Sequence, residues 1–353
     1  MSVPFARIAT EEAFATAELF ACYERIIDRR TVDDPGFYSL WGHYLMDRGS
    51  RATDIRRKLL DLRDERLDDM DSSGIARQVV SLTAPGVQVL DTETAVSVAA
   101  SANDQLAEAI ARHPSRFTGL AAMAPQDPAR AAAEIDRAIG SLGFRGVILN
   151  SHTHGEYFDD PKFWEIFEAA EQLGVPIYLH PNTPSPRLIG PMLDSGLDGA
   201  IYGFAVETGL HLLRIIVSGV FDRFPKLRIL VGHLGEALPF WLFRLDFMHA
   251  AMVRAGRHPG IQPLRKRPGD YLRENVLVTT SGMAWEPAIM FVRSVIGPDR
   301  VMYAMDYPYQ FVPDEVRVTD DLPISDAEKR AFYQGNAESV FSLDRARPSE
   351  AVT

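Results

Sequence analysis

The chain alternates short apolar runs with longer segments in which apolar residues recur every three or four positions. Short runs bounded by turn residues are typical of buried strands, and the longer periodic segments are typical of amphipathic helices. The helical spacing is clearest at residues 53–72, 92–113, 161–173 and 205–222. We assign strands to residues 6–10, 76–82, 117–123, 144–149, 176–179, 227–232, 275–280 and 301–305.

A strand followed by a helix, repeated about eight times, predicts a parallel sheet with helices around it. This repeat favours a (β/α)8 TIM-like barrel over an open doubly wound sheet. The first strand is not followed by G-x-G-x-x-G, which argues against the dinucleotide-binding form of the open sheet. Barrels of this length commonly fold as one unit, so residues 1–353 are predicted to form a single domain.

Two segments interrupt the repeat. Residues 31–60 are rich in aromatic side chains, and we predict a lid-like inserted loop there, because long ordered loops in compact domains commonly cover a site. Residues 182–204 are rich in Pro and Gly and are expected to form a second such excursion. The tail after about residue 342 is predicted to be flexible.

Four of the predicted strands lead directly into acidic or histidine side chains, namely Glu11, His180, His233 and Asp306. Barrel enzymes carry their chemistry at the carboxyl ends of the strands. Glu11, His180 and Asp306 supply two carboxylates and an imidazole, a set that suits Mn²⁺, Zn²⁺ or a similar divalent ion and leaves positions open for substrate or water. Any one of them alone is more often a hydrogen-bonded structural residue, so the metal prediction depends on their joint placement.

Glu236 follows His233 by three residues and could fix the tautomer of the imidazole and raise its basicity. The alternative is a helix cap without chemistry. Arg51 in the insertion and Arg244 on a later helix carry planar guanidinium groups that suit a substrate carboxylate, although exposed arginines are commonly only solvated.

Two further side chains are candidates for the pocket. Tyr309 could donate its phenol to the site, with core packing as the alternative. His152 follows the fourth predicted strand, and we expect it to line the pocket.

The net charge of -11 and the pI near 5.3 argue against nucleic acid or an anionic membrane as a partner. The single Cys22 excludes an internal disulfide and fits a reducing compartment. No apolar run is long enough to span a membrane, and the N-terminus lacks the apolar core of an export signal. We therefore expect a cytoplasmic protein.

Six stretches carry a resemblance that no single one of them would support: residues 8–14, 39–42, 150–153, 198–204, 231–239 and 303–309. Together they resemble the amidohydrolase superfamily and, more narrowly, its metal-dependent, non-oxidative aromatic acid decarboxylases, in particular those that act on 5-carboxyvanillate. The hydrolytic members usually carry His-x-His after the first strand, where this chain has Glu11 and Ala13. Binuclear members place a bridging lysine or acid after the fourth strand, where this chain has Asn150-Ser151-His152. The resemblance therefore implies a single metal ion.

By this resemblance, Glu11, His180 and Asp306 bind the ion, which would be Mn²⁺, with Zn²⁺ or Mg²⁺ also compatible, and no organic cofactor is needed. Asp306, linked to His233 and Glu236, would protonate the ring carbon that carries the carboxylate before CO₂ leaves. His233 is the alternative proton donor.

The resemblance also assigns Arg51, Arg244 and Tyr309 to the substrate's second carboxylate or its oxygens. The expected substrate is a small aromatic carboxylate, 5-carboxyvanillate, with a dihydroxybenzoate such as γ-resorcylate as the main rival. Two further functions compete with decarboxylation: metal-dependent hydrolysis of a pyrone or lactone, and metal binding without enzymatic activity. Family likeness also implies a homo-oligomer, a dimer or a tetramer.

Overall fold

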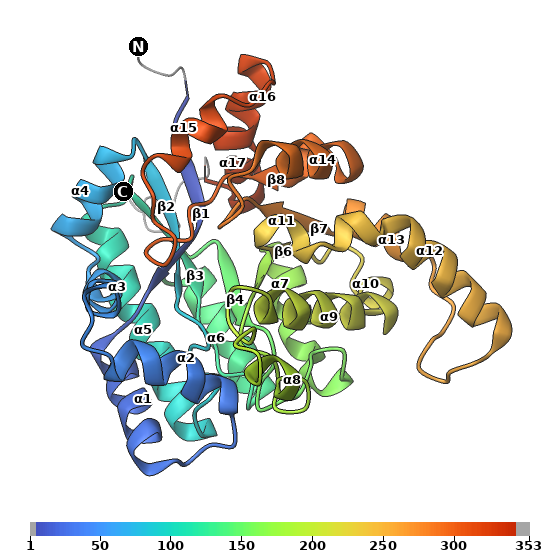
Figure 1. Cartoon of the computed structure of the whole chain (residues 1–353), viewed down its shortest axis with the longest axis horizontal. Helices are drawn as coiled ribbons and strands as arrows, with labels where there is room; N and C mark the ends of the chain where they lie inside the picture. The colour runs from blue at the N-terminus through green and yellow to red at the C-terminus, as the bar shows by residue number, and fades with distance from the viewer. Residues whose placement is uncertain (1–4, 344–353) are drawn as a thin grey trace.

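Eight parallel strands form the centre of the protein in the computed structural model, which describes residues 5–343 (Figure 1). They pair in sequence order from first to last, each beside its neighbour in the chain. The strands are β1 (Ile8–Phe14), β2 (Arg77–Leu82), β3 (Phe117–Ala121), β4 (Gly146–Asn150), β5 (Ile177–His180), β6 (Ile229–Val231), β7 (Val276–Thr279) and β8 (Val301–Met302).

The sheet curls into a nearly closed barrel, because the segment after β8 returns to β1. The N–H of Thr10 donates to the carbonyl of Tyr303 at 3.1 Å, and that of Ala13 donates to the carbonyl of Tyr307 at 2.7 Å. Glu12 and Tyr307 form a parallel bridge. Almost every strand residue is buried, as expected for strands covered on both faces. The prediction of a TIM-like (β/α)8 barrel is confirmed.

Helices follow the strands and surround the barrel (Figure 1). Several begin with a side-chain cap; for example, the Thr16 hydroxyl accepts from the N–H of Leu19 at the start of α1. The longer helices are α1 (Ala17–Arg29), α2 (Pro35–Met46), α3 (Ser50–Leu60), α4 (Asp64–Ser72), α5 (Thr92–Arg112), α6 (Pro128–Gly140), α7 (Trp164–Leu173), α9 (Gly203–Val217), α12 (Leu238–Ala255) and α14 (Glu286–Ile296).

The remaining helical segments are short and lie mainly near the strand ends and at the end of the chain. They are η1 (Pro161–Phe163), α8 (Gly190–Leu193), α10 (Val220–Arg223), α11 (His233–Glu236), α13 (Pro268–Glu274), η2 (Pro298–Arg300), α15 (Glu315–Asp320), α16 (Asp326–Arg330), η3 (Ala331–Gly335) and α17 (Asn336–Phe341). The predicted flexible tail lies almost wholly outside the described residues.

The insertion at residues 31–60 is helical, so the prediction of a loop there was wrong. The Asp34 side chain accepts from the N–H of Phe37 at 2.9 Å and Pro35 occupies the first turn, which together start α2. Phe37 and Trp41, four residues apart, face the core, and the Trp41 indole donates to the carbonyl of Ala84 at 3.1 Å. The aromatic residues therefore follow helical spacing.

Two other boundaries also differ from the predictions. The predicted helix 53–72 is split into α3 and α4, because the Asp61 carboxylate takes the N–H of Arg63 at 2.6 Å and competes with the helical pattern. The strand predicted at 6–10 continues to Phe14, which pairs with Leu82 of β2, so Glu11 lies within β1 and not at its end. A register shift between Ala9 and Glu12 marks an irregularity at this point.

The α12 helix projects from the barrel together with the following loop and forms an arm (Figure 1). Only Leu238, Pro239 and Leu242 are buried on it. No helix within residues 5–343 combines the length and apolar character needed to cross a bilayer.

Candidate metal centre and active site

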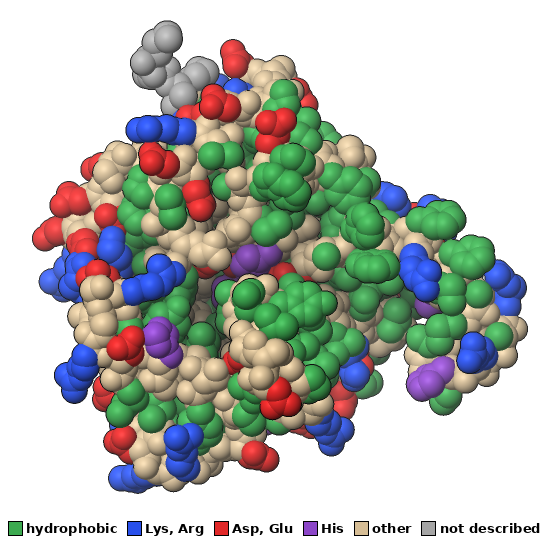
Figure 2. Space-filling model, viewed as in Figure 1, with side chains coloured by type: hydrophobic (Ala, Val, Ile, Leu, Met, Phe, Trp, Pro, Cys, Tyr) green, Lys and Arg blue, Asp and Glu red, His purple; other side chains and the backbone are tan. Residues whose placement is uncertain are grey.

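The three predicted metal ligands meet at the mouth of the barrel. Glu11 of β1, His180 at the end of β5 and Asp306 after β8 each offer one ligand atom, and these atoms all lie within 4.8 Å of one another. Figure 2 shows a hollow near the centre of this face in which histidine and acidic side chains are visible. The structure therefore brings together residues from opposite ends of the chain, because the barrel places the strand ends in one ring.

The orientation of His180 is fixed by a backbone contact. Its Nδ1 lies 2.8 Å from the carbonyl oxygen of Pro181, which can only accept, so Nδ1 carries the proton. The other ring nitrogen, Nε2, lies 3.3 Å from Oε1 of Glu11. Oε1 is buried and has no hydrogen-bond partner among the described residues. Nε2 of His180 and Oε1 of Glu11 both carry lone pairs, so at this distance they need a proton or a cation between them. These two atoms therefore fit as ligands of a divalent metal ion.

Hydroxyl groups hold the second oxygen of Glu11. Oε2 accepts hydrogen bonds from Tyr178, Thr279 and Ser281, and the Thr279 bond measures 2.9 Å. Gly232 leaves the space for this carboxylate, because a Cβ atom at that position would lie 2.7 Å from Oε2. One oxygen of Glu11 is therefore fully engaged by the protein, and only Oε1 is left for a ligand.

The charges in the cluster shift the pKa values of the two carboxyl groups in opposite directions. Burial raises the pKa of Glu11, but the charge of His233 and the contact with His180 outweigh burial and lower it. Burial raises the pKa of Asp306, and the negative charge of Glu11 raises it further. Asp306 is thus the carboxylate that takes up a proton more readily.

His233 and Glu236 form the contact that the sequence predicted. Nδ1 of His233 lies 2.9 Å from Oε1 of the buried Glu236, and the N–H of His233 donates to Ser281 at 3.1 Å. The backbone here is not a regular helix, because His233, Leu234 and Glu236 all have positive φ angles. Burial lowers the pKa of His233, but the charges of Glu236 and Glu11 outweigh it and raise the pKa to about 10. The two carboxylates therefore favour the protonated form of His233.

A cavity of about 170 Å³ lies beside these groups. Arg51 reaches its rim from α3 and donates to the carbonyl of Tyr309 at 3.0 Å, and the phenol of Tyr309 lies 2.6 Å from the Thr83 hydroxyl. Two of the predicted substrate contacts, Arg51 and Tyr309, are thus at the site. The cavity is lined by Leu40, Tyr44, Arg51, Thr83, Ala84, His180, Ala200, Phe204, His233, Asp306, Tyr309 and Gln310.

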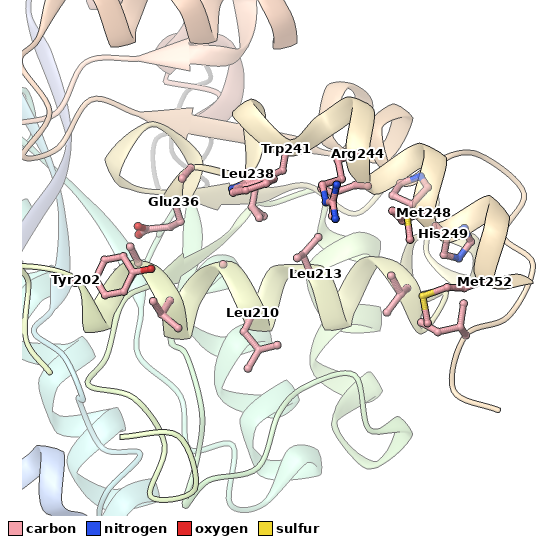
Figure 3. Close-up of a pocket in the computed structure, with 18 residues that line it drawn as sticks. Tyr202, Leu210, Leu213, Glu236, Leu238, Trp241, Arg244, Met248, His249 and Met252 are labelled. Carbon is pink, nitrogen blue, oxygen red and sulfur yellow. The ribbon is translucent and has the colours of Figure 1, made fainter. Parts of the chain in front are cut away.

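The other two predicted substrate contacts do not line this cavity. His152 is buried: its Nδ1 accepts from the N–H of Gly155 at 3.1 Å, and its Nε2 lies 3.1 Å from the carbonyl of Thr183, so both ring nitrogens are already engaged. Arg244 lies on the exposed face of α12 and points toward α9 across a groove of about 560 Å³ (Figure 3). Within this chain, neither side chain is placed to touch a substrate in the cavity.

Sequence reasoning missed the residues that support the ligands. Tyr178 precedes His180 by two positions and shares its face of β5, and alternation along the strand could have identified it. Thr279 and Ser281 stand in the same relation at the end of β7. The cavity walls from α2 and the start of α9 gave no comparable signal, because they are apolar or aromatic.

Comparison with known proteins gives a consistent result. The sequence profile of the family described as amidohydrolase matches residues 43–343. The γ-resorcylate decarboxylase of a Polaromonas species is 34% identical over 349 residues, which cover 96% of this chain and 99% of that protein.

Two solved structures are similar over almost their whole length. The 5-carboxyvanillate decarboxylase of Novosphingobium aromaticivorans, crystallised with manganese and 4-hydroxy-3-methoxy-5-nitrobenzoic acid, is 52% identical with a TM-score of 0.95, covering 97% of each chain. The 5-carboxyvanillate decarboxylase of Sphingomonas paucimobilis is 40% identical with a TM-score of 0.89, covering 97% of this chain and 99% of that one.

Proposed function

This chain belongs to the amidohydrolase family and is an aromatic acid decarboxylase within it, and we propose that its substrate is 5-carboxyvanillate. In the proposed reaction a proton replaces the carboxylate on the ring, giving vanillate and CO₂. The observation that carries the proposal is the Glu11, His180 and Asp306 cluster beside a cavity with Arg51 at its rim. The named relatives and the manganese in solved neighbours support it.

We assign one divalent ion, Mn²⁺, to Glu11, His180 and Asp306. When bound, such an ion would gather the phenolate and carboxylate oxygens of the substrate and stabilise negative charge on them. The ion needs the unpartnered Oε1 of Glu11 and the free Nε2 of His180, and both face the same point. The reaction takes up a proton and releases CO₂, so it requires no organic cofactor.

Two groups can supply the proton to the ring carbon. Burial and Glu11 raise the pKa of Asp306 in the metal-free site, and a carboxylate that binds the ion must take up a proton before it can donate one. His233 carries a proton in its own right, and Glu236 stabilises the imidazolium that results. Both line the cavity, so proton transfer from either reaches a ring bound there. We propose Asp306 as the donor and His233 as the alternative.

The second carboxylate of the substrate distinguishes 5-carboxyvanillate from γ-resorcylate. Among the described residues, Arg51 is the only arginine or lysine that lines the cavity, and its guanidinium can form two parallel hydrogen bonds with a carboxylate. The lining also contains Tyr44 and Tyr309, whose ring centroids lie 5.5 Å apart and which border the same cavity. A substrate with an added carboxylate therefore finds a positive charge at the rim.

The test is turnover by the Mn²⁺-loaded protein with 5-carboxyvanillate, following CO₂ and vanillate together. We expect equal amounts of both, and loss of both with a chelator. Consumption of γ-resorcylate alone would overturn the substrate assignment but not the reaction class. Ring opening of a pyrone or lactone with uptake of water would favour a hydrolase. Two features already count against that function: Ala13 stands where hydrolytic members carry the second histidine of His-x-His, and both ring nitrogens of His152 are hydrogen-bonded within the protein.

We also propose that the protein forms a homo-oligomer through α12. Five large apolar side chains are exposed on this arm: Phe240, Trp241, Phe243, Phe247 and Met248. Figure 2 shows hydrophobic side chains gathered along the projecting arm. Exposed patches of this kind mark interaction surfaces. Light scattering after gel filtration tests this: a dimer or tetramer is expected, and Phe243→Asp should shift it toward the monomer.

A further inference from the structure

Glu12 follows the metal ligand Glu11 directly, yet its side chain serves a different contact. It is completely buried, and each of its two oxygens accepts a backbone hydrogen bond. Oε1 accepts from the N–H of Met305 at 3.0 Å, and Oε2 accepts from the N–H of Tyr307 at 2.9 Å. One carboxylate therefore holds both amides that flank Asp306.

Asp306 needs this support because of its backbone conformation. Its φ angle is 60°, in the left-handed region that residues with a Cβ atom seldom adopt. The peptide planes on either side determine where the Asp306 carboxylate points. The N–H of Tyr307 belongs to the peptide plane that follows Asp306, and the N–H of Met305 belongs to the plane that leads into Met305. Glu12 therefore holds the chain just before and just after Asp306 and restricts the direction of the third metal ligand.

Regular strand pairing does little to hold this segment. β8 comprises only Val301–Met302, so residues 303–307 lie beyond its ladder. Between β1 and this segment the contacts are two backbone hydrogen bonds, from Thr10 and Ala13, and the bonds to Glu12. The Thr10 hydroxyl adds one more to the Tyr303 carbonyl at 2.7 Å.

Arg66 stands behind this contact and is itself fully buried. Its guanidinium lies 4.6 Å from the ring centre of Tyr307 and donates to the Ala13 carbonyl at 2.6 Å and to Gln78 at 3.2 Å. Arg66 thus connects β1 and Tyr307 directly beside the Glu12 carboxyl group. A carboxylate with both oxygens accepting from N–H groups is a strong, directional anchor.

We propose that Glu12 is a positioning residue that assembles the metal centre by fixing Asp306 against β1. The two adjacent glutamates have different roles. Glu11 offers an oxygen to the ion, and Glu12 holds the segment that carries the ligand Asp306. Metal binding is then coupled to closure of the barrel where residues 303–307 contact β1. Coupling is reciprocal, so a bound ion must stabilise the Glu12 contact as much as that contact favours the ion. The inference rests on the proposed metal site but not on the substrate.

The first test compares Mn²⁺ affinity by calorimetry in three variants. Glu12→Gln replaces one acceptor oxygen by an NH₂ group, and Glu12→Asp keeps the carboxyl group but is one methylene shorter. Both should weaken Mn²⁺ binding by about tenfold or more, the scale known for groups that orient metal ligands. Glu207→Gln is the matched control, because Glu207 is equally buried and accepts the N–H of Ser185 at 3.0 Å away from the metal cluster. It should leave the affinity within about twofold.

Each outcome bears on the role of Glu12. Wild-type affinity in both Glu12 variants would overturn the proposal. Weak binding in Glu12→Gln with normal binding in Glu12→Asp would mean that charge alone matters, which also overturns positioning. If Glu207→Gln loses as much Mn²⁺ affinity as Glu12→Gln, the loss reflects general destabilisation of the fold, and the positioning role of Glu12 is overturned.

The second test needs no substitution. Hydrogen exchange of the wild-type protein with and without Mn²⁺ should show slower exchange in residues 303–309 when the ion is bound, because the Met305 and Tyr307 amides are held by Glu12. The Ser185 amide, held by Glu207, should not change. Mn²⁺ binding without slower exchange overturns the Glu12 assignment alone. A wild-type protein that binds no Mn²⁺ overturns the metal site and the assignment together.

Discussion

Two clusters in this protein each bring a glutamate close to a histidine, but they serve different purposes. At the barrel mouth, Glu11, His180 and Asp306 converge on one point. Behind β4, Glu207 and His211 of α9 surround the Ser151 hydroxyl, with Ser151 Oγ 3.0 Å from Glu207 and 3.2 Å from His211. A glutamate, a histidine and a serine at these distances have the outline of a catalytic triad.

Hydrogen bonding distinguishes the two clusters. Nε2 of His211 accepts from the N–H of Phe158 at 3.0 Å, and the oxygens of Glu207 accept from Ser151, Tyr157 and Ser185, each at 3.0 Å. Every ring nitrogen and carboxylate oxygen there has a partner, and Ser151 is fully buried. At the mouth, Oε1 of Glu11 has none among the described residues. Satisfied polar clusters fix the structure, whereas an unsatisfied acceptor marks a place for a ligand.

The first prediction exchanges the two glutamates for glutamine. Glu11→Gln removes the anionic ligand atom, so we expect Mn²⁺ affinity to fall by more than about a hundredfold and turnover to be lost, with little change in thermal stability. Glu207→Gln should cost about 1–3 kcal/mol of unfolding free energy, since one buried donor loses its acceptor, and should leave Mn²⁺ affinity intact. Calorimetry and thermal unfolding measure both. Metal loss in Glu207→Gln, or severe unfolding in Glu11→Gln, would contradict the distinction.

The second prediction concerns the two arginines that the sequence proposed for the substrate. Arg51 lines the cavity and Arg244 does not. Because a charged hydrogen bond contributes about 1.5–3 kcal/mol, Arg51→Ala should lower kcat/KM for 5-carboxyvanillate about 10- to 100-fold. The loss for γ-resorcylate should be smaller, because it lacks the second carboxylate. Arg244 lies on α12, the proposed oligomer interface, so the comparison between the two substrates serves as the control. An equal loss for both substrates in Arg51→Ala would contradict the role of Arg51.

These arginines illustrate what the sequence could and could not reveal. The topology of the barrel brings strand ends together, so Glu11, His180, His233 and Asp306 could be grouped from the chain order alone. Side-chain direction depends on single backbone angles. Ser151 has a positive φ of 45°, which turns the chain after β4, and His152 ends in the interior rather than in the cavity.

The same limit explains two other differences. Ala237 has a φ of 61° just before α12, where the chain leaves the barrel, and Arg244 lies on the resulting arm. The sequence alone could not distinguish the role of Glu12 from that of Glu11. Only the register of β1 against residues 303–307 places the Glu11 carboxylate in the metal cluster and the Glu12 carboxylate against the backbone of residues 303–307.

The third prediction uses the pKa of the buried His211, which is shifted in the opposite direction to that of His233. Burial, with the nearby charges of His152 and Arg214, lowers the pKa of His211 to about 3. The unfolded state binds a proton near pH 6.5, while the native state does not until about pH 3, so this group destabilises the fold as pH falls through that window. The slope contributed is at most about 1.4 kcal/mol per pH unit. Denaturant unfolding between pH 7 and 4 should show a flatter dependence in His211→Gln, and an unchanged slope would contradict the neutral assignment.

The smallest effect is expected from the hydroxyls that hold Glu11. Thr279→Val keeps the shape of the side chain but removes the donor that lies 2.9 Å from Oε2. Tyr178 and Ser281 still donate to the same oxygen, so the carboxylate stays in place and only one bond of about 1 kcal/mol is lost. We expect Mn²⁺ affinity to fall about fivefold. Thr319→Val is the matched control, because Thr319 is equally buried and its hydroxyl pairs with Tyr333 at 2.7 Å on another part of the fold. A loss as large as that of Glu11→Gln would mean that this single hydroxyl, and not the set of three, orients the metal ligand.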